Sequence, residues 1–205
     1  TLSYKDSTWP KTAFILFTYL SLVFLLYFNS LNGAFSFDDY HTITENPAIH
    51  TVHSIWYYFL NPRTSTSLPE NYNYRPFFTW ITSLLWALSP TMGAAKSPVV
   101  FHLAKIAIHA AMGIVTTLLG SAIGFSILES IWAGLIFVVH PALNENVNYI
   151  CTLSTQLAAL FQLISAYIFI TISKPNYFFS RFGPIRSALV ALVFYFLALS
   201  SKEES

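Results

Sequence analysis

Charged residues are scarce in this sequence of 205 residues. Lysine and arginine together number 10, aspartate and glutamate number 9, and the formal net charge at pH 7 is +1. The chain therefore has no basic field that would attract nucleic acid, and we expect no nucleic-acid partner. The single cysteine, Cys151, cannot form an internal disulfide and lies within an apolar run. A small packing residue is its simplest interpretation.

Several motifs that indicate common enzyme classes are also missing. The sequence contains no glycine-rich phosphate loop, no Gly-x-Ser-x-Gly motif and no His-Glu-x-x-His motif. Its histidines are too scattered to indicate a metal site, and nothing in the pattern supports a divalent cation. We therefore expect no resident metal or cofactor.

Apolar residues dominate what is present. They make up 55% of the chain, and the mean hydropathy is +0.55. Several runs reach the length of about 20 apolar residues that a membrane-spanning helix needs. We predict an all-helical integral membrane protein with about five spans and one or two interfacial helices in its first outer loop. The predicted spans are 12–35, 98–124, 126–143, 147–173 and 185–200.

The apolar stretch 77–89 decides the topology, because its length of about 13 residues is more typical of an interfacial helix than of a span. Lys174, Arg181 and Arg186 form the one purely basic loop. The positive-inside rule favours this loop and the N-terminus on the cytoplasmic side, which five spans achieve and six do not. Residues 36–97 then form a long loop on the outer side. The membrane is the bacterial inner membrane or the endoplasmic reticulum.

The outer loop contains a second candidate interfacial helix. Asn46 is a good N-cap, Pro47 a good first helical residue, and apolar residues recur at helical spacing as far as Leu60. This pattern predicts one amphipathic helix on the membrane surface, with the aromatic residues at 56–58 at headgroup depth. The polar, turn-rich residues 61–74 are predicted to form a mobile loop.

The acidic residues gather between the apolar runs and, in the five-span topology, share the outer side. Asp38 and Asp39 follow the first span, where a carboxylate is suited to act as a general base beside a membrane-embedded substrate. The alternative is a solvated pair that closes a helix end. His140 and Glu145 follow the third span. Glu145 is suited to position a hydroxyl or bind a cation, and the alternative is an ordinary exposed glutamate.

Three polar residues share one face of the second span. His102, Lys105 and His109 are spaced i, i+3 and i+7 and descend from near the outer surface towards mid-membrane. Polar side chains at that depth usually face a bundle interior or a cavity, where a lysine suits a phosphate. The alternative is that Lys105 snorkels to the interface and the histidines are hydrogen-bonded core residues.

Basic residues also occur within the outer loop and directly after the last span. Arg75 precedes Pro76, where it is suited to bind phosphate or to pair with Asp38 or Asp39. Its alternative is an ordinary surface arginine. Lys202 and Glu203 close the chain on the outer side, where a lysine can also neutralise phosphate.

Taken in order, these short motifs carry a family resemblance. They are Phe37-Asp38-Asp39, Tyr74-Arg75-Pro76-Phe77, Phe101-His102 with His109, His140-Pro141 with Glu145, and Leu199-Ser200-Ser201-Lys202-Glu203. The chain resembles the N-terminal part of the GT-C membrane glycosyltransferases, most closely the O-mannosyltransferase-like proteins that often end in tetratricopeptide repeats. The resemblance implies a multi-span fold, a polyprenyl- or dolichyl-phosphate sugar donor, and transfer to a hydroxyl on the luminal or periplasmic face.

By position, the resemblance makes Asp38 or Asp39 the catalytic base. The candidates for donor or substrate binding are Arg75, His102, Lys105, His109, His140, Glu145, Lys202 and Glu203. The expected partners are membrane lipid, the lipid-linked donor and other membrane protein subunits.

The sequence departs from this family at two places. Residues 149–156 lack the arginine and following acid that are usual there, and Lys105 stands where asparagine is more usual. The members of this family are usually about twice this length or more, so we expect a fragment or a truncated relative. A catalytically inactive subunit on a GT-C-like scaffold is therefore the alternative function. A transporter is less favoured, because no span is interrupted by paired glycines or prolines in matching halves.

Overall fold

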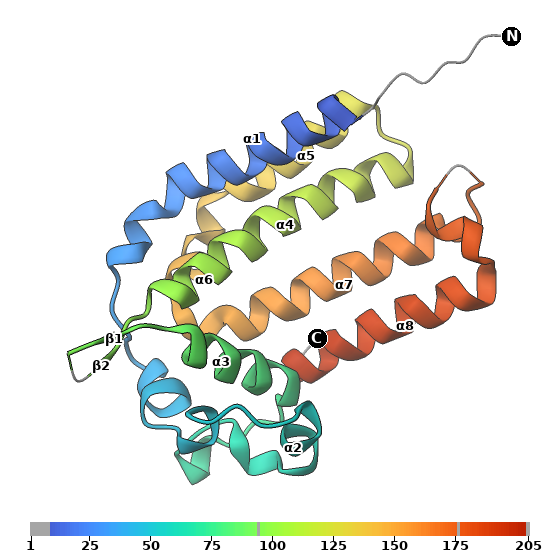
Figure 1. The fold of residues 1–205 in the computed structure, drawn as a ribbon. Helices are drawn as coiled ribbons and strands as arrows, with labels where there is room; N and C mark the ends of the chain where they lie inside the picture. The colour runs from blue at the N-terminus through green and yellow to red at the C-terminus, as the bar shows by residue number, and fades with distance from the viewer. Residues whose placement is uncertain (1–8, 94, 176, 204–205) are drawn as a thin grey trace, which may run out of the picture.

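The computed structural model describes residues 9–93, 95–175 and 177–203, and helices account for 76% of the structure. Five helices pack alongside one another (Figure 1). They are α1 (Trp9–Tyr27), α4 (Val99–Ile123), α5 (Ile127–Val139), α7 (Leu153–Thr171) and α8 (Pro184–Ser201). The chain is thus a predominantly helical bundle, as the sequence predicts.

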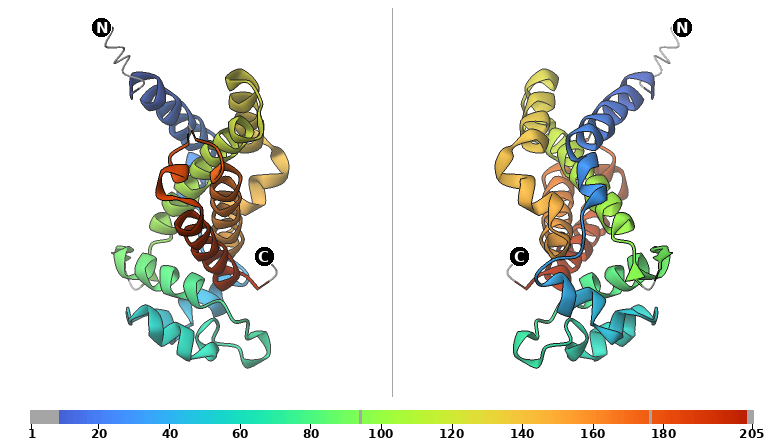
Figure 2. Two further views of the ribbon diagram at one scale, coloured as in Figure 1. Left: turned by 90° about the vertical axis from the view of Figure 1, so that its right-hand side faces the viewer. Right: turned by 90° about the vertical axis from the view of Figure 1, so that its left-hand side faces the viewer.

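Most of the other elements gather at one end of this bundle, which we call the site end, whereas the turn Phe179–Phe182 between α7 and α8 lies at the opposite end (Figure 1). Helix α3 (Pro76–Leu88) lies across the ends of α4, α7 and α8, and α2 (Ile55–Leu60) packs beneath it (Figure 2). Strands β1 (Thr91–Met92) and β2 (Ala95–Lys96) form a small antiparallel hairpin, with Thr91 opposite Lys96. The remaining elements are a π-helical turn at Tyr40–Thr44, the short helix α6 (Asn144–Asn148), and 3-10 turns at Phe28–Asn32, Pro47–Ile49, Pro62–Thr64, Pro69–Asn71, Pro141–Leu143, Ile150–Thr152 and Phe179–Phe182.

Length and composition identify candidate membrane spans within the described residues. Three helical stretches are long and apolar enough to cross a bilayer: Val99–Ile123, Ile150–Thr171 and Pro184–Ser201. A fourth candidate combines Ile127–Val139 with Pro141–Asn148, and these two pieces meet at an angle of 50°. These helices support association of the chain with a membrane. The five-span count and the interfacial position of α3 stay predictions.

Several helix ends differ from the predicted span limits for local reasons. The first predicted span runs to residue 35, but α1 gives way to a 3-10 turn after Tyr27. The predicted span 126–143 ends early, because His140 is extended and Pro141 has no N–H for a continuing helix. The predicted starts at Pro76 and at Asn46 agree with the structure, in which Pro76 begins α3 and Asn46 caps the turn that Pro47 begins.

The predicted continuous helix over 47–60 is wrong. The turn Pro47–Ile49 is separated from α2 by the non-helical residues 50–54, and Tyr58 points inward and is fully buried. Its hydroxyl donates to the carbonyls of Ala48 and Thr51, at 3.4 and 3.3 Å, and so folds α2 back on the turn. Trp56 is 69% exposed, whereas Tyr58 is buried in the core and does not face the surroundings of the protein.

Part of the segment 61–74, which the sequence predicts to be a mobile loop, packs on the π-helical turn. Thr64, Ser65 and Thr66 are buried. The Asn46 side chain donates to the Thr64 carbonyl at 2.9 Å, and the Ser67 amide donates to the His41 carbonyl at 2.8 Å. The segment therefore forms one wall of the site end.

Helices α1, α4 and α5 pack closely against one another. A Cβ atom added to Gly134 on α5 would lie 2.5 Å from the carbonyl oxygen of Gly113 on α4, so glycine is required for this approach. The Tyr19 hydroxyl of α1 bonds to Thr117 Oγ1 at 2.5 Å and donates to the Ile131 carbonyl at 3.0 Å. Helices α1, α4 and α5 thus meet at a buried polar contact.

Candidate functional site

A tight turn points the side chains of the two adjacent aspartates in different directions. Phe37 has a φ of 48°, in the left-handed region, and the Ser36 amide donates to Asp39 Oδ2 at 2.9 Å. This turn directs Asp39 into the protein and Asp38 outward. The Asp39 residue is 0% exposed, whereas the Asp38 side chain is 62% exposed.

The buried carboxylate of Asp39 faces polar groups of the membrane bundle. Burial raises its pKa to about 6, while the backbone amides of Ser36 and Cys151 and the positive charge of Lys105 oppose this rise. Its Oδ1 atom has no hydrogen-bond partner among the described residues. The carboxylate of Asp39, on the loop, is thus attracted by the charge of Lys105 on α4, and solvent does not reach it.

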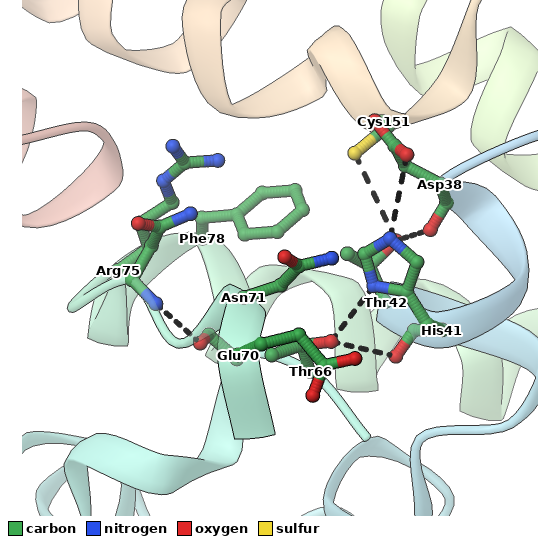
Figure 3. Close-up of a pocket in the computed structure, with 11 residues that line it drawn as sticks. Asp38, His41, Thr42, Thr66, Glu70, Asn71, Arg75, Phe78 and Cys151 are labelled. Carbon is green, nitrogen blue, oxygen red and sulfur yellow. Dashed lines mark hydrogen bonds and ion pairs between the residues drawn. The ribbon is translucent and has the colours of Figure 1, made fainter. Parts of the chain in front are cut away.

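Two cavities meet at Asp38. The first has a volume of about 340 Å³ (Figure 3), and its lining includes Asp38, His41, Thr42, Thr66, Arg75 and Cys151. The second has a volume of about 600 Å³, and its lining includes Phe37, Asp38, Asn144, Glu145, Asn148 and Tyr149. Asp38 lines both, so its carboxylate is accessible from two sides.

The immediate neighbours of Asp38 hold it in place. His41 Nε2 lies 3.3 Å from Asp38 Oδ1, and the backbone amide of Asp38 donates to the Tyr149 hydroxyl at 3.0 Å. Burial raises the pKa of Tyr149, and the nearby carboxylates of Asp38 and Asp39 add to this rise. The Tyr149 hydroxyl therefore stays protonated and neutral at physiological pH.

Arg75 pairs with Glu203 and not with either aspartate. Its Nε and one terminal nitrogen donate to the two carboxylate oxygens of Glu203, at 3.0 and 3.2 Å. Partial burial tends to raise the pKa of Glu203, but the hydrogen bonds and charge of Arg75 outweigh it and hold this pKa below its usual value. The expected alternative pairing of Arg75 with Asp38 or Asp39 is wrong. The pair joins the start of α3 to the end of α8 and adjoins the first cavity.

His102, Lys105 and His109, which we call the polar stripe of α4, are buried in the bundle and line neither cavity. Lys105 is fully buried and donates to Thr152 Oγ1 at 3.0 Å, so it does not snorkel. His109 donates from Nε2 to the Val138 carbonyl at 3.0 Å, as a hydrogen-bonded core histidine does. His102 packs against the backbone at Gly33, and neither of its ring nitrogens has a partner among the described residues. The stripe thus lies behind Asp39, away from the two cavities.

The other predicted residues are divided between the site and its surroundings. Glu145 lines the second cavity together with Asp38. His140 lines neither cavity, since its Nδ1 accepts the Ala142 amide at 3.2 Å and caps a 3-10 turn. Lys202 follows the last residue of α8 and precedes Glu203, which bonds to Arg75. Asp38, Arg75, Glu145 and Glu203 are thus brought to the site end.

Sequence reasoning missed several residues of the first cavity. His41 could have been found, because it follows Asp38 by three residues and so lies one helical turn away. Thr66 could not have been found in this way, because it lies 25 residues after His41 in the sequence. Cys151, expected to be a packing residue, lines the cavity and is half-buried, with its Sγ 3.8 Å from Thr42 Oγ1. Within the described part of the chain, no three His, Cys, Asp or Glu side chains are grouped so as to hold a metal ion.

Comparison with known proteins gives one similarity. The chain is 27% identical over 188 residues to protein O-mannosyl-transferase TMTC3 of Homo sapiens. The match covers 89% of this chain and 19% of that protein. No protein-family model matches the chain, and no solved structure matches it. The chain therefore has a weak likeness to a glycosyltransferase, over a region that is about a fifth of that relative.

Proposed function

We propose that this chain forms the outer-loop site of a GT-C type membrane glycosyltransferase. In this proposal a sugar passes from a polyprenyl- or dolichyl-phosphate donor to a hydroxyl of a protein or lipid acceptor on the luminal or periplasmic face. The observation that carries the proposal is the position of Asp38. Its exposed carboxylate is shared by two cavities at the end of an apolar helical bundle. The likeness to TMTC3 over most of the chain supports it.

Asp38 is the catalytic base of the proposed reaction. It accepts the proton of the acceptor hydroxyl while the acceptor oxygen forms a bond to the sugar's anomeric carbon. The bond between that carbon and the phosphate oxygen breaks, and its electron pair leaves with the lipid phosphate. Asp39 cannot take this role, because its carboxylate is buried and lines neither cavity.

The charges of the two cavities favour different substrates. The first contains the carboxylates of Asp38 and Glu70 but also Arg75, whose planar guanidinium is suited to bind a phosphate in two-point fashion. The second contains the carboxylates of Asp38 and Glu145 and no basic side chain in its lining, which disfavours an anionic phosphate. We place the donor phosphate on the Arg75 side and the acceptor hydroxyl on the Glu145 side of Asp38. Donor binding then requires Arg75 to exchange Glu203 for phosphate.

The proposed membrane arrangement has five spans, a cytoplasmic N-terminus and the site end on the outer side. Helix α3 lies across the bundle end, where an interfacial helix would meet the headgroups. The donor's lipid tail would then remain in the bilayer while its phosphate reaches the first cavity. The Lys202–Glu203 segment at the end of α8 lies on this side as well.

The test is sugar transfer by the purified chain in lipid nanodiscs. The donor is dolichyl-phosphate mannose with a radiolabelled sugar, and the acceptor is a synthetic peptide rich in serine and threonine. Asp38→Asn should lower the rate by at least about 100-fold, the usual contribution of a general base. Glu45→Gln is the matched control, because Glu45 is an exposed carboxylate that lines neither cavity. Wild-type transfer that persists in Asp38→Asn would remove this mechanism.

A second candidate is a catalytically inactive subunit of a larger membrane complex. The observation that favours it is the Arg75–Glu203 pair, which already neutralises the one arginine of the first cavity. In this case the site end would contact other membrane proteins. Wild-type chain that transfers no sugar in nanodiscs, but copurifies with a stoichiometric membrane partner, would favour this candidate over the enzyme.

A further inference from the structure

We propose that His41 is a positioning residue, which holds one oxygen of the Asp38 carboxylate so that the other can accept a proton from the substrate. Thr66, on the segment 61–74, fixes the histidine ring for this task. This inference rests on the proposed function, because it assigns the support of the same catalytic base. Nothing in the sequence motifs pointed to either residue.

Three side chains form a continuous hydrogen-bonded chain along the first cavity (Figure 3). His41 Nε2 lies 3.3 Å from Asp38 Oδ1, and His41 Nδ1 lies 2.7 Å from Thr66 Oγ1. Both ring nitrogens of His41 therefore have a partner. This distinguishes it from His102, whose ring nitrogens have none among the described residues.

The surrounding hydrogen bonds assign the tautomer of His41. The Thr66 hydroxyl accepts the Leu68 amide at 3.1 Å and has a single hydrogen of its own to donate. That hydrogen can point to the His41 carbonyl at 3.3 Å or to Nδ1 at 2.7 Å, and the shorter contact is the stronger one. With Nδ1 accepting, the neutral ring carries its proton on Nε2 and donates it to Asp38 Oδ1. The opposite tautomer would set the Nε2 lone pair against a carboxylate oxygen.

The support for this chain of bonds is buried and hydrogen-bonded to the backbone. Thr66 is 3% exposed, and the neighbouring Ser67 amide donates to the His41 carbonyl at 2.8 Å. The histidine ring is thus fixed between the π-helical turn and the segment 61–74. Because Oδ1 of Asp38 is occupied by His41, Oδ2 is the oxygen left to accept the substrate proton.

The role of His41 in the reaction follows from these positions. The substrate proton moves to Asp38 Oδ2, and the sugar–phosphate bond breaks as already described. His41 keeps its Nε2 proton throughout and only orients the carboxylate. Loss of this orientation should affect the transition state and leave substrate binding unchanged.

The kinetic test compares His41→Phe with His41→Gln in the nanodisc assay with dolichyl-phosphate mannose. Phenylalanine keeps the flat ring and loses both hydrogen bonds, so kcat should fall by about 100-fold with KM unchanged. The amide nitrogen of glutamine can still donate to Asp38, so it should restore at least about a tenth of the wild-type rate. Wild-type kcat in His41→Phe, or equal losses in both variants, would overturn the proposal.

A spectroscopic readout separates this proposal from the proposed function. Protein labelled with ¹⁵N in histidine should show one ring, absent from His41→Phe, that is protonated on Nε2 and unprotonated on Nδ1. Thr66→Val should change the tautomer of this ring, whereas Thr66→Ser should preserve it. A ring protonated on Nδ1 in the wild type overturns the positioning role, whether or not sugar is transferred. If the wild type transfers no mannose, the proposed function fails and the role of His41 in it falls too.

Discussion

The site end and the polar stripe of α4 differ in their access to solvent, although the sequence suggested that both belong to a functional site. At the site end, Asp38 is exposed and flanked by open space on two sides. In the stripe, Lys105 and His109 are buried and satisfied by Thr152 and Val138. Polar residues within a membrane helix can thus serve to hold a loop in place, without contact with a substrate.

The two adjacent aspartates show the same difference at the scale of one peptide bond. Asp38 lines both cavities, whereas Asp39 is buried and interacts with the charge of Lys105 in the stripe. The first should therefore affect chemistry and the second should affect stability. The following predictions test this division, from the largest expected effect to the smallest.

Removal of the buried lysine should have the largest effect on stability. Lys105→Ala leaves the Asp39 carboxylate without its opposing charge and the Thr152 hydroxyl without its donor. Loss of a buried charged donor that leaves its partner without a hydrogen bond costs about 1–3 kcal/mol. Thermal unfolding in detergent should show a clear drop in midpoint. Lys96→Ala, which removes a lysine that donates to the Ser89 carbonyl, is the control and should change the midpoint far less.

The pH dependence of stability should identify Asp39. Its pKa is about 6 in the folded protein against 3.8 for the ordinary carboxyl group, so the folded state binds the proton more tightly. Stability contributed by this group is then greatest at low pH, falls as the pH rises through this interval, and is constant above it. Asp39→Asn should remove that part of the slope in thermal unfolding measured from pH 4 to pH 7. A wild-type slope that Asp39→Asn leaves unchanged would contradict the assignment.

Thiol labelling should separate the two regions by access. Cys151 is the one cysteine of the sequence and lines the first cavity, so a small charged methanethiosulfonate reagent should modify it in the folded protein. A cysteine placed in the stripe by His109→Cys, in a Cys151→Ser background, should stay unmodified until the protein unfolds. Mass spectrometry of the intact protein gives both rates. Equal labelling of the two positions would remove the distinction between cavity and stripe.

The Arg75–Glu203 pair should have the smallest effect on stability. The Arg75 and Glu203 side chains are 18% and 40% exposed, and ion pairs with this access to solvent contribute less than about 1 kcal/mol. Glu203→Gln should therefore leave the thermal midpoint nearly unchanged. The same change frees Arg75 for phosphate, so the KM for dolichyl-phosphate mannose should fall. A raised KM would indicate that Glu203 itself contacts the substrate.

The sequence was sufficient for features that depend on local pattern. Long apolar runs located α4 and α8 closely and α7 less closely, since α7 begins at Leu153 and the predicted span at 147, and Pro76 and Asn46 marked the starts of a helix and a turn. It was insufficient where a distant contact decides the outcome. Tyr58 breaks the expected helix by turning into the core. The difference between Asp38 and Asp39 depends on a left-handed turn at Phe37, which is uncommon for a bulky residue.

The most direct test of the central claim is sugar transfer by Asp38→Asn and Asp39→Asn, measured side by side in the same nanodiscs with thermal unfolding of each. The account predicts that Asp38→Asn unfolds at the wild-type temperature and transfers almost no mannose, while Asp39→Asn changes stability and still transfers. Transfer that survives in Asp38→Asn, or is lost selectively in a stable Asp39→Asn, would contradict it.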